Sequence, residues 1–154
     1  MMDACAIMWS GTEQSSYVTR RMRQSKYVPT IDFSDLFSYS ERCLMKSLDA
    51  LSALQEDWDG YGAPRVSKVT ISRCRKTIKA FRSSLYARMT VAANDWGGVQ
   101  LRYNFMGGLV CCDFGDDRMS YYIKWNTGNV EFHSFEEYTE SNIKSLGEIF
   151  YNLA

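Results

Sequence analysis

The sequence predicts an α+β domain: two helices, then a four- to five-stranded antiparallel meander, then a C-terminal helix packed on one face of the sheet. Apolar residues recur at helical spacing in two segments before residue 86 and again after residue 139. Between them, turn residues recur roughly every ten residues, as in a meander. Helices and strands occupy separate parts of the chain, whereas a parallel sheet requires them to alternate.

Composition indicates a packed globular protein, since 45% of the 154 residues are apolar and 14% are aromatic. The 18 basic and 18 acidic residues balance, so net charge favours neither nucleic acid nor a membrane surface as partner. The charges are nevertheless segregated. Eight bases and no acid lie between Arg65 and Arg88, whereas nine acids and four bases lie between Met89 and Ala154. One basic and one acidic face are therefore expected.

Residues 1–30 are expected to form a partly flexible N-terminal arm, and residues 31–154 a single domain. No signal peptide and no apolar run of membrane-spanning length is found, which predicts a cytoplasmic protein that does not bind membranes. Five cysteines without a CxxC pair agree with a reducing compartment. Alternation along a strand predicts that one of Cys111 and Cys112 is buried and the other exposed.

The first helix is predicted over residues 39–55. Ser38 and Glu41 have the spacing of a capping box. The apolar face of this helix consists of leucines three or four residues apart, namely Leu44, Leu48, Leu51 and Leu54.

The second helix follows Pro64, with Ser67 as its N-cap. Its apolar face is predicted to run to Leu85, and its outer face is basic. The core-facing residues are Ile71, Cys74, Ile78, Phe81 and Leu85.

The turn between these helices, Asp57–Pro64, contains two acids, two aromatics and two glycines. Trp58 and Tyr61 are expected to pack under the sheet. Asp57 and Asp59 supply too few oxygens for a calcium loop, so the turn is interpreted as architecture.

Five strand segments follow, each bounded by turn residues, and Thr139 or Ser141 can cap the closing helix. Strict alternation makes the second strand the clearest of the five. The predicted segments are Met89–Ala92, Val99–Phe105, Leu109–Phe114, Met119–Trp125 and Val130–His133.

Two motifs, Trp58-Asp59-Gly60-Tyr61-Gly62-Ala63 and Gly97-Gly98-Val99-Gln100-Leu101, resemble a family of small bacterial and mobile-element proteins. That family has a W-[DN]-G-Y-x-A turn between two helices, then a G-G-[IV]-x-L strand and a meander. The resemblance spans about residues 44–133. It implies the α+β fold and a prokaryotic or phage origin, but no activity. The chain departs from the pattern at Trp96, where the family has a small or polar residue, and in its long N-terminal arm.

No residue set predicts catalysis, a metal site or a cofactor. His133 is the only histidine, and nothing in the sequence orients it towards Cys111 or Cys112 as a nucleophilic pair would require. Clustered carboxylates at Asp113, Asp116 and Asp117 leave a small metal-dependent hydrolase as a second alternative. A solvated turn explains the same residues, because Asp and Gly favour turn conformations.

Two surfaces are candidates for partner binding. The first is the outer face of the basic helix, with Lys68, Arg75, Lys76, Lys79 and Arg82. The second is an aromatic face with Trp96, Tyr121, Tyr122 and Trp125, residue types that anchor interfaces.

The preferred hypothesis is a non-enzymatic protein-binding module, with an inhibitor, an antitoxin-like factor or an anti-defence factor of a phage or mobile element as its more specific form. The alternative is a nucleic-acid-binding protein that uses the basic helix over residues 65–88, where each phosphate contact adds salt-dependent affinity. The partner and the oligomeric state stay open.

Overall fold

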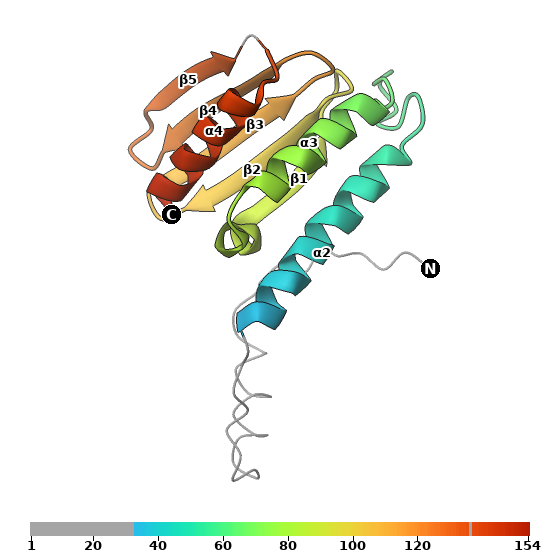
Figure 1. The fold of residues 1–154 in the computed structure, drawn as a ribbon. Coiled ribbons are helices and arrows are strands. Elements are labelled where there is room, and N and C mark those ends of the chain that lie inside the picture. Colours follow the sequence, from blue (N-terminus) through green and yellow to red (C-terminus); the bar gives the residue numbers. More distant parts are fainter. Residues whose placement is uncertain (1–32, 136) are drawn as a thin grey trace, which may run out of the picture. The chain divides into compact units, whose positions relative to one another are not determined.

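The computed structural model describes residues 33–135 and 137–154, and the arm expected over residues 1–30 lies outside them. Residues 36–154 form one compact unit, whose fold is described below together with the first residues of its first helix. Figure 1 shows its elements in order. They are α2 (Phe33–Ser52), α3 (Lys68–Ala80), a 3₁₀ helix η1 (Ser83–Arg88), five strands, and α4 (Glu140–Leu153).

The strands form one antiparallel sheet in the order β1-β2-β3-β4-β5, so each pairs with its neighbour in sequence. The predicted α+β meander is confirmed, with five strands. Their bounds are β1 (Met89–Ala93), β2 (Val99–Phe105), β3 (Gly108–Phe114), β4 (Met119–Trp125) and β5 (Val130–Phe135).

The register assigns each strand residue to one of two faces, because residues directly opposite each other on neighbouring strands share a face. One row crosses the sheet through Val91, Leu101, Cys112, Tyr121 and His133. This face packs against α3 and α4, which lie on the same side of the sheet (Figure 1). We call it the helix side.

The opposite face is called the open face, because no described helix covers it. Its central row contains Thr90, Arg102, Cys111, Tyr122 and Phe132.

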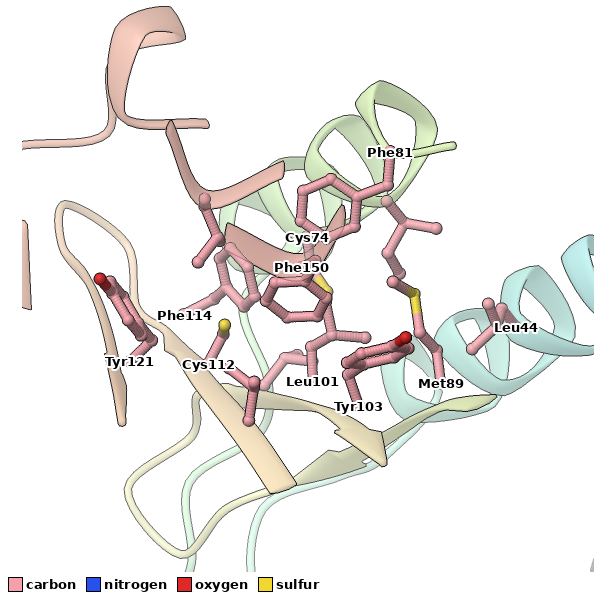
Figure 2. Close-up of a cluster of buried hydrophobic side chains, with 14 of the residues drawn as sticks. Leu44, Cys74, Phe81, Met89, Leu101, Tyr103, Cys112, Phe114, Tyr121 and Phe150 are labelled. Atoms are coloured by element: carbon pink, nitrogen blue, oxygen red, sulfur yellow. The ribbon is translucent and has the colours of Figure 1, made fainter. Parts of the chain in front are cut away.

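Aromatic rings and leucines fill the space between the helices and the sheet (Figure 2). Phe150 of α4 is fully buried, with its ring centroid 4.9 Å from that of Phe81 and 5.1 Å from that of Tyr103. Leu44 and Leu48 of α2 belong to the same core. The α4 cap is as predicted, since Thr139 Oγ1 accepts a hydrogen bond from Asn142 N at 3.2 Å.

The predicted start of the first helix is wrong. The chain is already helical at Phe33, so Ser38 lies inside α2 and forms no capping box. The helix tolerates nearby serines because Ser40 Oγ donates back to the Leu36 carbonyl at 3.1 Å. It also ends earlier than predicted, at Ser52, and Leu54 reaches the core from the following turn.

The second helix has the predicted Ser67 N-cap but ends at Ala80, not near Leu85. Phe81 is extended, and Leu85 enters the core from η1. The Tyr86 hydroxyl donates to the carbonyls of Ile78 at 3.1 Å and Phe81 at 3.3 Å. It thus satisfies backbone oxygens at the place where the helix stops. Apolar spacing alone could not reveal this change of backbone, because η1 presents Leu85 to the same core.

The two adjacent cysteines are both buried, which corrects the prediction that one is exposed. They do point to opposite faces. Cys112 lies in the core on the helix side, whereas Cys111 lies on the open face between its cross-strand neighbours Arg102 and Tyr122. A central position in a five-stranded sheet is therefore enough to bury a small side chain without a covering helix.

The Asp57–Pro64 turn does not pack under the sheet as predicted, since Tyr61 is 94% exposed and Trp58 is partly exposed. Its acids hold the backbone. Asp59 Oδ1 accepts hydrogen bonds from the amides of Tyr61 at 2.9 Å and Ala63 at 3.0 Å, and these bonds lower the pKa of Asp59. Asp57 Oδ1 accepts from Gly62 N at 2.7 Å. The interpretation of this turn as architecture fits these contacts.

Candidate functional site

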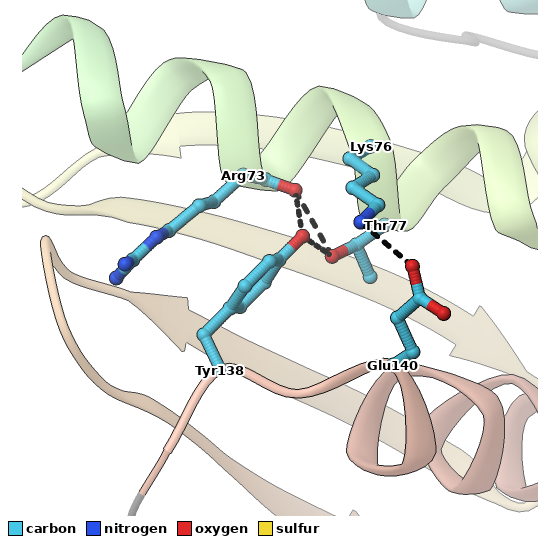
Figure 3. Close-up of polar contacts among 5 residues, drawn as sticks. All are labelled: Arg73, Lys76, Thr77, Tyr138 and Glu140. Carbon is cyan, nitrogen blue, oxygen red and sulfur yellow. Dashed lines mark hydrogen bonds and ion pairs between the residues drawn. The ribbon is translucent and has the colours of Figure 1, made fainter.

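Three of the five basic residues selected on the second helix have partners within the described residues. Arg75 pairs with Asp49 at 2.6 Å, and Lys76 pairs with Glu140 at 3.2 Å (Figure 3). Arg82 does not lie on the helix as predicted but follows its end, as the N-cap of η1, and its guanidinium lies 3.6 Å from the centroid of the Tyr151 ring. Lys68 and Lys79 are exposed. The basic face is thus partly neutralised by residues from α2 and α4, which lowers its attraction for phosphates.

The four selected aromatic residues do not form one surface. Tyr121 is buried on the helix side. Trp125 packs on the same side, with its ring centroid 5.5 Å from that of Phe105. Tyr122 points to the open face. Trp96 is 54% exposed in the turn between β1 and β2. Strand alternation separates Tyr121 from Tyr122, so their adjacency in sequence is no guide to a shared surface.

The two motifs of the family resemblance meet in space. A β-carbon at Gly97, where φ is +82°, would lie 3.0 Å from Pro64 Cγ and 3.2 Å from the Arg65 carbonyl. A β-carbon at Gly98 would lie 2.3 Å from the Trp96 ring. The glycines therefore allow the β1–β2 turn to lie against the Asp57–Pro64 turn and let Trp96 fold over the strand.

Beside this contact lies an open cavity of about 480 Å³ between the start of α3 and the β3–β4 turn, lined in part by Trp96 and Arg65. Three carboxylates line it, and each has its own partner. Asp116 accepts from the hydroxyls of Ser67 and Thr70, which lowers its pKa. Asp113 accepts from Gln100 Nε2 at 3.0 Å, and Asp117 lies 3.6 Å from Arg118.

These carboxylates do not converge on one point. Within residues 33–135 and 137–154, no group of three or more His, Cys, Asp or Glu side chains is placed to hold a metal ion. The geometry gives no support to the metal-dependent hydrolase.

A Cys–His pair is not assembled either. His133 is exposed on β5 and stacks on Tyr121, with ring centroids 4.7 Å apart. Tyr121 lies between His133 and Cys112 in the register, so His133 and Cys112 are separated by two strand spacings, about 10 Å. Burial raises the pKa of the Cys112 thiol well above its ordinary value, which disfavours the thiolate.

The open face combines an apolar edge with a polar centre. Phe132 is 79% exposed and Val130 is 42% exposed, and Leu109 lies beside them on the same face. Towards β2, Arg102 Nε donates to Gln100 Oε1 at 2.6 Å, and Gln100 donates in turn to Asp113. This arrangement offers both apolar contact and directed hydrogen bonding.

Tyr122 and Cys111 join the two halves of the open face. A hydrogen bond to Cys111 and burial raise the pKa of the Tyr122 hydroxyl to about 12. The centroids of the Phe132 and Tyr122 rings lie 5.7 Å apart.

Apart from Tyr122, the residues of the open face are not among those predicted from the sequence to bind a partner. The signal for this face was present, since Leu109 and Cys111, like Val130 and Phe132, alternate onto the outward face.

Comparisons of this chain with protein-family models, curated proteins and solved structures find no match. The resemblance to a mobile-element family therefore stays a prediction. None of the described helices combines the length and the apolar character that crossing a membrane requires.

Proposed function

We propose that this protein is a non-enzymatic protein-binding module that contacts its partner through the open face of the sheet. The observation that supports this proposal is the exposure of large apolar side chains, Phe132 and Val130 above all, on a face that no described element covers. Contiguous exposed apolar residues rimmed by polar ones are typical of protein interaction sites. The hydrogen-bonded Arg102–Gln100 pair supplies such a rim.

A protein partner suits this surface better than nucleic acid. Arg102 and Lys124 on the open face are accompanied by Asp113, so the face has no strong positive field. The basic helix is the better candidate for phosphate contacts, but Arg75 and Lys76 already have acidic partners. The role of an inhibitor, an antitoxin-like factor or an anti-defence factor of a phage or mobile element remains the specific form of this proposal.

A cytoplasmic location is part of the same proposal. The described cysteines, Cys43, Cys74, Cys111 and Cys112, are all free, as expected in a reducing compartment.

Site-specific photo-crosslinking tests the proposal. A photoreactive phenylalanine analogue replaces exposed Asn104 on the open face, and a matched control carries it at exposed Lys79 on α3. In cells of the encoding organism, we expect one discrete adduct from position 104 and none from position 79. Adding Leu109→Asp to the probe chain is expected to remove the adduct without changing the melting temperature by more than a few degrees. Adducts from position 79 alone, or from neither position, would contradict the proposal.

A gel-shift experiment separates the nucleic-acid alternative. Within the part of the chain that the structure describes, Lys68 and Lys79 are exposed bases of α3 that form no salt bridge, so their reversal to Glu removes the most available charge. A salt-sensitive shift of short duplex DNA or RNA that disappears in this double variant would favour the alternative. We expect no shift at low salt with the unaltered protein.

A further inference from the structure

The outer edge of β5 lacks the features that usually protect an edge strand. β5 is the last strand of the sheet, and no described element pairs with its outer side. Natural proteins block such edges with charged side chains, above all Lys, or with Pro, bulges or very short strands. β5 has six residues and contains neither Lys nor Pro, and the described side chains of residues 130–134 are all exposed. Its one charged residue, Glu131, accepts a hydrogen bond from Trp125 of its own sheet. The sequence of β5 is Val130, Glu131, Phe132, His133, Ser134 and Phe135.

The β4–β5 turn determines which backbone groups point outward. Trp125 N donates to Asn129 O and Gly128 N donates to Trp125 O, both at 2.9 Å, so the ladder begins with a hydrogen-bonded pair at Trp125. Such pairs alternate along an antiparallel ladder. In the observed register, Glu131 and His133 therefore bond to β4, whereas the amides and carbonyls of Val130, Phe132 and Ser134 point away from the sheet.

We propose that β5 pairs antiparallel with β5 of a second copy of this chain, about a twofold axis at Phe132. This register matches all the outward groups: Phe132 faces Phe132, and Val130 faces Ser134 in both directions. It yields three hydrogen-bonded pairs, at 130/134, 132/132 and 134/130. Centring the axis one residue away, on Glu131 or His133, leaves only two such pairs within the strand.

The side chains agree with the same register. Glu131 faces His133 of the second copy twice, in the closer, non-hydrogen-bonded positions of the ladder. A carboxylate opposite an imidazole can accept a hydrogen bond from the ring N–H, whereas two carboxylates placed opposite each other repel. Glu131 and His133 are both held in place by their own protomer, since Glu131 Oε1 accepts from Trp125 Nε1 at 2.9 Å and the His133 ring stacks on Tyr121.

The two faces of the joined sheet leave room for this pairing. On the open face, the Phe132 rings of the two copies meet, each already beside a Tyr122 ring. On the helix side, Glu131 and His133 are exposed, so no described helix covers β5 there. Pairing would double the five-stranded sheet and join two open faces into one surface. This inference goes beyond the proposed function, since it concerns the purified chain without any other partner.

Sedimentation of the purified full chain tests the pairing. Over about 5 to about 200 µM, we expect the mass to rise towards that of a dimer, because one strand pair buries less area than a standard interface. Phe132→Pro removes an outward amide that β4 does not use, so the fold should persist while the dimer is lost. Phe132→Lys should act in the same way. Asn104→Lys, on the open face away from the edge, should leave the dimer intact.

Monomer at every concentration, or a dimer that survives both Phe132 variants, overturns the proposal. Failure of the crosslinking experiment at Asn104 would leave this result unaffected, so the two proposals fail independently.

Charge exchange and disulfide formation test the register. Glu131→Lys and His133→Glu should each weaken the dimer at least tenfold, and the double variant should restore it.

In a chain with Cys5 and Cys43 replaced by Ser, Phe132→Cys should form an intermolecular disulfide on oxidation. Residues of a hydrogen-bonded pair have Cα atoms about 5.5 Å apart, within disulfide range. Cross-linking of a His133→Cys control instead, or no rescue by the double variant, overturns the register.

Discussion

A missing β-carbon at Gly108 allows β3 and β4 to lie side by side. A Cβ at this position would lie 2.1 Å from the Lys124 carbonyl oxygen, which is a backbone atom and cannot rotate away. Gly108→Ala is therefore expected to lower the free energy of unfolding by about 3 kcal/mol, the upper end of what overpacking usually costs. Gly128→Ala is the matched control: φ is +93° there, but nothing lies within 4 Å. We expect about 1–2 kcal/mol from its left-handed backbone alone. Urea unfolding of both variants measures the difference, and equal losses would contradict the steric explanation.

The carboxylate of Asp116 makes part of the stability dependent on pH. Hydrogen bonds from Ser67 and Thr70 lower its pKa below the ordinary 3.8. A carboxyl whose pKa is depressed in the folded state stabilises the fold above pH 3.8, and this contribution is lost as pH falls through the lowered pKa. Asp116→Ala should therefore reduce the melting temperature at pH 7, with a difference that shrinks below pH 3.8. Asp117→Ala serves as the control, because Asp117 is exposed and pairs with the equally exposed Arg118 at 3.6 Å. A difference that is constant with pH would refute the assignment.

Among the elements, α3 is attached to the segment before α4 by Tyr138, whose hydroxyl bonds to the Arg73 carbonyl (Figure 3). The Tyr138 hydroxyl lies 2.6 Å from the Arg73 carbonyl, to which it donates, and 2.9 Å from Thr77 Oγ1. Tyr138→Phe should lower the free energy of unfolding by about 1 kcal/mol, since it removes a partly buried hydrogen bond. Lys76→Ala, which breaks the exposed pair with Glu140, should cost less than about 0.5 kcal/mol. Thermal or urea unfolding compares them, and a larger loss from Lys76→Ala would reverse this ranking.

The same scale explains what the sequence could predict. Turn residues at regular spacing located all five strands, and strict alternation identified the second one, because each side chain of a strand reports its own face. Helix bounds were less accurate: apolar spacing at Leu85 continues through the change from α3 to η1, and Ser38 resembles a cap inside a helix. The partners of the basic helix could not be predicted, because Asp49, Glu140 and Tyr151 come from α2 and α4, far away in sequence.

At the scale of the described fold, we expect the buried core on the helix side to supply most of the stability, and the largely exposed Asp57–Pro64 turn to supply little. Phe150 is fully buried against Phe81 and Tyr103, so Phe150→Ala should cost about 3–5 kcal/mol. The sequence predicted that Trp58 packs under the sheet, but its ring is partly exposed, and its Nε1 donates to the Pro64 carbonyl at 3.3 Å. Trp58→Ala should cost about 1 kcal/mol. Calorimetry of both variants provides the test. Comparable losses in the free energy of unfolding would mean that Trp58 contributes as much to stability as a core residue.

The strand order has a consequence for how the chain folds. Every ladder joins consecutive strands, so each closes a short loop, and loop-closure entropy stays small. Contacts between residues near in sequence favour rapid folding. The sheet can therefore form hairpin by hairpin, starting from the tight turns at Gly107–Gly108 and Asn126–Asn129. Docking of α4 on Phe81 and Tyr103 then joins residues that are far apart in sequence, so we expect mutations at Phe150 to change the unfolding rate more than the folding rate.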